Sequence, residues 1–166
     1  MANTVLLGLE FVTNPWDVRV EQICRSWLGT NYKLNRCEKG IGVDCIHFVA
    51  AVLDELYGVK HSKNLKSLPP DCAVHNKRGV MRAGRALLEA YPAHQRVSDG
   101  CVHAGDLVLT GPVSDEPTTS HLLIAGSRGK LWQANAVGVC FTGYGMPSTE
   151  MLVGIYRASD KEKWLL

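Results

Sequence analysis

The chain has 166 residues, of which 46% are hydrophobic and 20% charged, a composition typical of globular domains. This length suits one domain with a sizeable core, and we expect a single domain over residues 1–166. A formal net charge of +2, with no block of lysine and arginine, argues against a nucleic-acid partner. No stretch approaches the roughly 18 apolar residues of a membrane span, so no spanning segment is expected.

The N-terminal segment and the cysteines indicate the compartment. Residues 1–15 lack a basic start and carry an acidic residue in their apolar run, so we predict no secretion signal and expect synthesis in a cytoplasm. The six cysteines are therefore expected to be reduced. Two half-pairs, Cys72 with His75 and Cys101 with His103, do not have the spacing of a zinc site, so no metal is predicted.

The first part of the chain predicts a strand and then a helix. Residues 4–12 predict a short strand, and residues 14–29 predict a helix that Asn14 caps and Gly29 ends. One apolar stripe with helical spacing runs along this helix: Trp16, Val20, Ile23 and Trp27. Residues 30–43 are polar and contain glycine, which predicts a loop.

Further helices are predicted in the middle of the chain. Residues 45–58 predict a helix that Gly58 closes, followed by a loop over residues 59–76. Its apolar face has helical spacing: Cys45, Phe48, Val49, Val52 and Leu56. Residues 77–91 predict another helix, which Pro92 stops.

The second half of the chain predicts strands. Five short segments rich in valine, leucine, isoleucine and aromatic residues are separated by glycine-containing turns: residues 106–110, 121–126, 129–135, 138–141 and 151–158. Helices that come first and strands that come later favour the α+β class, with N-terminal helices packed on one side of a mostly antiparallel sheet.

Cys45 lies at the first turn of its predicted helix, directly after Asp44, a residue type that caps helices well. Unpaired N–H groups and partial positive charge at a helix start stabilise a thiolate. We therefore expect an acidic, nucleophilic thiol at the end of the helix that meets solvent, provided that a base is close. The alternative is an ordinary core cysteine, the usual role of a lone cysteine in an apolar helix.

His121 is the best-placed base among the six histidines. It opens an apolar strand next to a loop rich in proline and threonine, where it can face a cleft and exchange a proton with Cys45. The other five are weaker candidates, because they fall in polar segments, lie just before a strand, or point away from Cys45 on its own helix: His61, His75, His94, His103 and His47.

A third group is expected to orient the imidazole through its other nitrogen. Gln133 and Asn135 lie two residues apart on the next predicted strand and therefore point to the same face. Gln133 is closer to the middle of that strand, so it is the preferred partner of His121.

Five segments occur in a characteristic order: GTNY (29–32), GVDCIHFVAAVLDELYG (42–58), AGDLVLT (104–110), SHLLIAG (120–126) and LWQANA (131–136). Together they resemble the NlpC-type cysteine peptidases of bacterial cell walls, a papain-like family. The spacing WLGTNY…GIGVDC…LYG is most similar to the branch encoded in phage tail modules and gene transfer agents. The resemblance covers residues 16–157 and implies a papain-like fold.

This resemblance implies a role for each matching residue. Cys45 would be the nucleophile, His121 the general base and acid, and Gln133 the orienting residue. Tyr32 would line the site and help to stabilise the oxyanion, and Asp44 would hold the free amine of a peptide stem. The implied reaction is hydrolysis of amide bonds in peptidoglycan stem peptides, with no metal or organic cofactor.

Two positions depart from the family pattern, in which a Ser-Gly pair often follows the cysteine. This chain has Ile46 and His47 there, and we expect both to alter how substrate binds. The implied partners are a peptidoglycan stem peptide and phage-tail or secretion-machine proteins, which would carry the chain into a tail or to the periplasm and cell wall. An interbacterial amidase effector would use the same residues. Two alternatives stay open: a non-catalytic structural component of a phage tail tip, and a papain-like acyltransferase or thioesterase.

Overall fold

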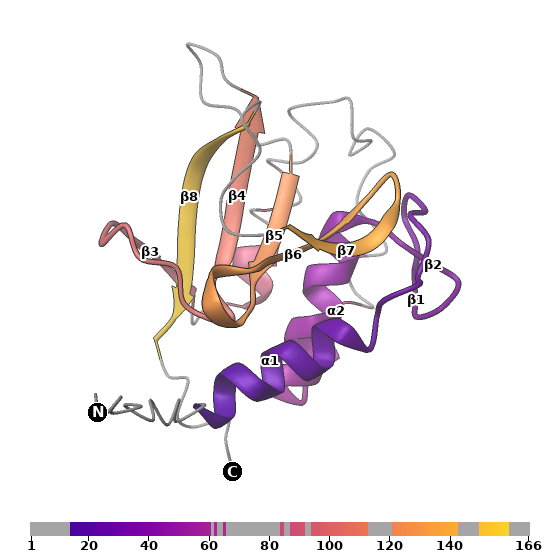
Figure 1. Ribbon diagram of the computed structural model, residues 1–166, viewed down its shortest axis with the longest axis horizontal. Helices are drawn as coiled ribbons and strands as arrows, with labels where there is room; N and C mark the ends of the chain where they lie inside the picture. The colour runs from indigo at the N-terminus through magenta and orange to yellow at the C-terminus, as the bar shows by residue number, and fades with distance from the viewer. Residues whose placement is uncertain are drawn as a thin grey trace, which may run out of the picture.

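The computed structural model describes residues 14–60, 62, 65, 84, 87–91, 94–112, 121–142 and 150–159. Within these residues, two α-helices pack together against a six-stranded sheet, and a short two-stranded ribbon lies beside them (Figure 1). The helical elements are α1 (Pro15–Arg25), α2 (Cys45–Tyr57) and the 3-10 turn η3 (Ser127–Gly129). The strands are β1 (Cys37–Glu38), β2 (Gly42–Val43), β3 (His94–Val97), β4 (Leu107–Pro112), β5 (His121–Ala125), β6 (Leu131–Asn135), β7 (Gly138–Thr142) and β8 (Glu150–Ala158).

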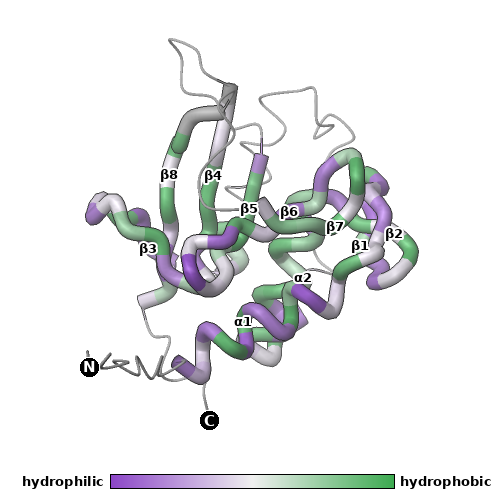
Figure 2. Tube along the Cα trace, viewed as in Figure 1, coloured by the Kyte–Doolittle hydropathy of each residue, from purple (hydrophilic) through white to green (hydrophobic). Residues whose placement is uncertain are grey.

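The large sheet has the strand order β3-β8-β4-β5-β6-β7, and every neighbouring pair in it is antiparallel. Hydrophobic segments gather along β4, β5 and α2 (Figure 2), where the main core lies between helices and sheet. The described elements confirm the predicted α+β class and the antiparallel sheet.

Helix α1 follows its sequence signals at the start. The Asn14 side chain accepts a hydrogen bond from the backbone N–H of Trp16 at 2.9 Å, and Pro15 occupies the first helical position. The predicted apolar stripe is buried in full: Trp16, Val20, Ile23 and Trp27. The helix ends at Arg25, earlier than predicted, because the chain tightens into turns that precede Gly29, whose φ is +82°.

Helix α2 is enclosed on nearly every side. Its C-terminal cap, Gly58, has a left-handed φ of 65°, as the sequence predicts. The predicted apolar face is buried: Cys45, Phe48, Val49, Val52 and Leu56. Ile46, His47 and Ala50 on other faces are buried too, so α2 is a central core helix that carries the site at its N-terminal end.

The predicted loop over residues 30–43 contains more structure than the sequence suggested. Strands β1 and β2 form an antiparallel ribbon, and Tyr32 pairs with Val43 in an isolated bridge. Gly40, at φ +78°, provides the left-handed residue that lets the chain reverse between the two strands. The bridge holds Tyr32 next to Val43, one of the residues that precede Cys45.

Strand β3 was not predicted, and His94, which lies in a polar segment of the sequence, is buried in the structure. His94 is only 8% exposed and begins β3, which pairs with β8. Its ring meets Tyr57 and Tyr91 edge-on, with centroids 5.9 and 6.5 Å away. Aromatic contacts from distant segments therefore bury a histidine whose sequence neighbours are polar.

Some predicted elements lie outside the described residues. The strand expected over residues 4–12 is among them, as is much of the helix expected over residues 77–91. Within that second range, residues 84 and 87–90 are helical.

Gly105 shows how tightly α1 meets the sheet. The indole N–H of Trp16 donates to the carbonyl of Ala104 at 2.8 Å, and a Cβ at Gly105, whose φ is +86°, would lie 2.9 Å from that nitrogen. We expect Gly105→Ala to lower the free energy of unfolding by about 2–4 kcal/mol, through backbone strain plus overpacking. Gly100→Ala is the matched control, since its φ is +71° but nothing lies within 4 Å of its added Cβ. Urea unfolding should show the larger loss for Gly105→Ala; equal losses would mean that contact with Trp16 contributes nothing.

Candidate active site

The candidate site lies where two neighbouring strands separate. β5 and β6 are paired only through Ile124–Trp132 and Ala125–Leu131, although β5 begins at His121 and β6 continues past Gln133. Helix α2 packs against both strands. Beyond these two pairs, the backbones of β5 and β6 are not paired with each other.

Cys45 lies directly against the start of β5. The backbone amides of Leu122, the residue after His121, of Cys45 itself and of Ile46 lie close enough to the Cys45 sulfur to lower the pKa of its thiol. The sulfur therefore lies near backbone amides of two elements, α2 and β5, that are far apart in the sequence. The candidate nucleophile thus lies near the residue that follows the candidate base, His121.

His121 and Gln133 are joined by a short hydrogen bond. His121 Nε2 and Gln133 Oε1 lie 2.7 Å apart, and Gln133 is 7% exposed. A carboxamide oxygen only accepts, so Nε2 carries the proton and Nδ1 carries the lone pair when the ring is neutral. Gln133 thereby selects the tautomer in which Nδ1 is the basic atom, which is the function expected of an orienting residue.

The expectation of an acidic thiol is wrong for the resting protein. Cys45 is 5% exposed, and burial, followed by the negative charge of Asp44, raises the pKa of its thiol to about 12. The three backbone amides lower this pKa but do not outweigh burial. Sequence reasoning placed this end of the helix in solvent, and the packing of β5 and the ribbon closes it instead.

This raised pKa predicts how Cys45 reacts with iodoacetamide. Only the thiolate reacts, so the rate should rise about tenfold per pH unit between pH 7 and 9.5, with no plateau, because all of this range lies far below pH 12. At pH 7 the exposed Cys101 should be alkylated faster than Cys45. Mass spectrometry of cysteine-containing peptides measures both rates; a Cys45 rate that levels off between about pH 8.5 and 9.5 would show an ordinary thiol.

Tyr32 brings a buried hydroxyl without a partner to the same region. Its hydroxyl makes no hydrogen bond within the described part of the chain, although the atom is fully buried. Burial and the charges of Cys45 and Asp44 raise the pKa of Tyr32, so its hydroxyl is protonated and lies within electrostatic reach of both. An unsatisfied buried hydroxyl costs about 1–3 kcal/mol, which favours a partner that arrives with a ligand.

Asp44 caps α2, and both oxygens of its carboxylate accept hydrogen bonds from within the protein. Its Oδ1 accepts from the backbone N–H groups of Ile46 and His47 at 3.0 and 2.9 Å, and its Oδ2 accepts from Asn35 N–H at 2.8 Å. His47 Nδ1 lies 2.9 and 2.8 Å from the two oxygens. Asp44 is 4% exposed, so holding a substrate amine, the role implied by the resemblance, would require displacing one of these donors.

The two residues that depart from the family pattern are both part of the interior. Ile46 belongs to the main core cluster, and His47 is 2% exposed. Neither side chain lies at the surface, where a substrate contact was expected. The His47 ring instead contacts the Asp44 carboxylate.

Two groups at this site have no signature in the sequence. The N–H groups of Leu122 and Asn35 belong to the backbone, and residue type does not reveal which amides point into a site. Asn35 gives a partial indication, because its φ of 54° is a left-handed conformation that asparagine tolerates better than most residues.

Within the described residues, no group of three or more histidine, cysteine, aspartate or glutamate side chains is arranged to hold a metal ion. Cys101 is an exposed free thiol, and Cys72 and His75 lie outside the described residues.

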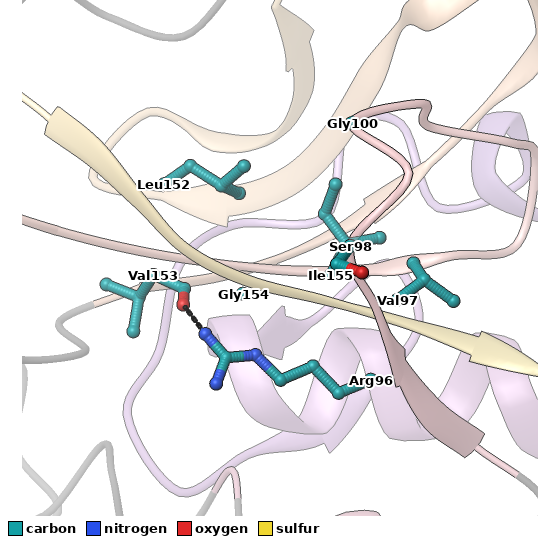
Figure 3. Close-up of a pocket in the computed structure, with 8 residues that line it drawn as sticks. All are labelled: Arg96, Val97, Ser98, Gly100, Leu152, Val153, Gly154 and Ile155. Atoms are coloured by element: carbon teal, nitrogen blue, oxygen red, sulfur yellow. Dashed lines mark hydrogen bonds between the residues drawn. The ribbon is translucent and has the colours of Figure 1, made fainter.

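Surface hollows lie elsewhere on the molecule. One of about 500 Å³ lies between β3 and β8, where Arg96 donates to the carbonyl of Val153 at 3.2 Å (Figure 3). A second, of about 350 Å³, lies at the start of α1 and is lined by Asp17, His103 and Arg128. Neither is lined by the residues that meet at Cys45.

Comparison with protein-family models finds no match for the chain, and comparison with curated proteins finds no relative. The family resemblance of its motifs therefore stays a prediction. None of the helices in the described part of the chain has both the length and the apolar character needed to cross a membrane.

Proposed function

We propose that this protein is a papain-like cysteine hydrolase of the NlpC type that cleaves amide bonds in peptidoglycan stem peptides. The observation that carries the proposal is that two contacts occur at neighbouring residues at the start of β5. The Leu122 amide lies close enough to the Cys45 sulfur to lower the pKa of its thiol, and Gln133 holds the adjacent His121 by a 2.7 Å hydrogen bond. A thiol at a helix start, a tautomer-fixed imidazole and an amide partner are the parts of a Cys-His-polar triad.

The reaction proceeds through a thioester. His121 Nδ1 takes the thiol proton as the Cys45 sulfur forms a bond to the substrate carbonyl carbon. The resulting oxyanion accepts hydrogen bonds from the backbone N–H of Cys45 and from the Tyr32 hydroxyl. The C–N bond breaks as the imidazolium returns its proton to the leaving amine. Water, deprotonated by His121, then cleaves the thioester and restores the thiol.

Proton transfer and attack occur together in this scheme. Because burial raises the pKa of the Cys45 thiol, the thiol is mainly protonated at pH 7 before substrate binds. A preformed thiolate is thus a minor species in the resting protein. The oxyanion donors at Cys45 and Tyr32 stabilise the negative charge once it has moved onto the substrate oxygen.

Partners beyond the substrate follow from the motif spacing alone. We propose a phage tail or a secretion machine as the carrier that brings the protein to the periplasm and cell wall. The second candidate function is a non-catalytic component of a phage tail tip that keeps this fold. One observation favours it: the resting Cys45 thiol is buried and protonated.

Product analysis of purified peptidoglycan separates these functions. Muropeptides incubated with the protein should gain one water molecule per cleaved amide bond, with a new amine and a new carboxylate at a single position of the stem. Tandem mass spectrometry identifies that position. Muropeptides that stay unchanged in several peptidoglycan chemotypes would favour the structural function.

A further inference from the structure

The carboxylate of Asp44 has no capacity left for a ligand. A carboxylate offers about four acceptor positions. Three backbone N–H groups occupy Asp44, from Asn35, Ile46 and His47, and the fourth donor is the ring N–H of His47. Because a carboxylate only accepts, His47 Nδ1 must be the protonated ring nitrogen in this contact.

Of these four donors, only the ring N–H of His47 belongs to a side chain. The other three are backbone groups of the helix start and of the preceding loop, which any sequence with this fold can supply. Asp44 also acts on the nucleophile, since its charge is the second cause of the raised Cys45 pKa. A cation on the substrate would need this carboxylate as its counter-charge, and burying an ammonium group without one is costly.

We propose that the His47 ring fills the acceptor position of the Asp44 carboxylate that an ammonium group of a substrate would otherwise use. The Cys45 site then takes peptides whose nearby amine is already acylated and rejects peptides that present a free ammonium group there. This inference rests on the proposed hydrolase function for the identity of the substrate. It assigns to His47 a specificity-determining role that acts through Asp44, with no contact to the reacting atoms.

A pair of small thiol reagents tests the electrostatic part without any hydrolysis. Methyl methanethiosulfonate is neutral, and its aminoethyl analogue carries an ammonium group. We define the charge preference of Cys45 as its rate with the cationic reagent divided by its rate with the neutral one, normalised to Cys101 in the same molecule. Peptide mass spectrometry resolves the two sites.

The wild-type charge preference should be about one or lower. His47→Ala removes the ring donor and frees the carboxylate, which should raise the preference about tenfold. His47→Asn keeps a side-chain N–H near the position of Nδ1 and should behave like the wild type. A wild-type preference well above one, or no increase in His47→Ala, would overturn the proposal. If His47→Ala does not fold, His47→Ser replaces it under the same criteria.

Peptide substrates then separate this inference from the proposed function. The same stem peptide is offered with a free amine and with an acetylated amine at the position nearest Asp44. The wild type should hydrolyse the acetylated form at least about tenfold faster, and His47→Ala should reduce that ratio. Faster cleavage of the free-amine form would overturn the inference and leave the hydrolase function standing. If neither peptide is cleaved, the hydrolase function fails, and the charge preference of Cys45 still decides the role of His47.

Discussion

Replacing Cys45 with alanine should lower the rate of amide hydrolysis by at least about 10⁴-fold. In the proposed reaction the Cys45 sulfur forms the thioester, and alanine has no nucleophilic atom to replace it. Members of a catalytic triad act as a unit, so little of the activity should survive the loss of one of them. Release of new amines from a defined stem peptide measures the effect.

The matched control is Cys101→Ala. This change also removes a free thiol, but Cys101 is exposed and lies in the segment between β3 and β4. Its activity should stay within about twofold of the wild type. Hydrolysis that persists in Cys45→Ala would mean that Cys45 is an ordinary core thiol and that the triad assignment is wrong.

Replacing Gln133 with leucine should lower kcat by about 10²–10⁴-fold and leave KM nearly unchanged. Leucine has a similar volume but cannot accept the 2.7 Å hydrogen bond from His121 Nε2. The imidazole then loses the contact that fixes its tautomer and orientation, a loss that costs other triads up to about 10⁴-fold. Steady-state kinetics on the same stem peptide separates kcat from KM.

Asn135→Ala is the control for this prediction. Asn135 lies on the same face of β6, but its side chain accepts from the backbone N–H of Val137 at 3.1 Å and shapes the turn to β7. Its loss should cost about 1 kcal/mol of stability and little kcat. A larger fall in kcat for Asn135→Ala than for Gln133→Leu would show that the wrong residue was assigned to orient His121.

Local signals in the sequence predicted the helices and strands well where the residue types at the element ends agree with the periodicity of the apolar residues. Asn14 and Asp44 cap their helices, Gly58 ends α2, and the apolar stripes predicted for both helices are buried. These features depend on residues within one or two helical turns of each other, so a single segment contains the information.

The pairing of His121 with Gln133 also follows from local information. The alternation of side chains along β6 put Gln133 on a defined face, and the two residues come from neighbouring strands joined by a short turn. Choosing between Gln133 and Asn135 required only the expectation that a central position in the strand is better ordered.

Long-range packing produced the differences between the sequence predictions and the structure. Burial, which raises the pKa of Cys45, and the contact of the Asn35 N–H with Asp44 both involve parts of the chain that lie outside α2. The burial of His94 depends on Tyr57 and Tyr91 in the same way. Such contacts are absent from any window of sequence, so reasoning from single segments assigned these polar groups to solvent.

The separation of β5 from β6 also affects the order in which the site assembles during folding. His121 and Gln133 are 12 residues apart and belong to one hairpin, so closing that loop costs little chain entropy. Cys45 meets the Leu122 amide only after the two halves of the chain have docked, a contact of high sequence separation that forms slowly. The base and its partner should therefore come together early and the nucleophile join them late. We therefore expect that a nascent or partly folded chain does not hydrolyse substrate, and that activity returns only with the last cooperative step of refolding.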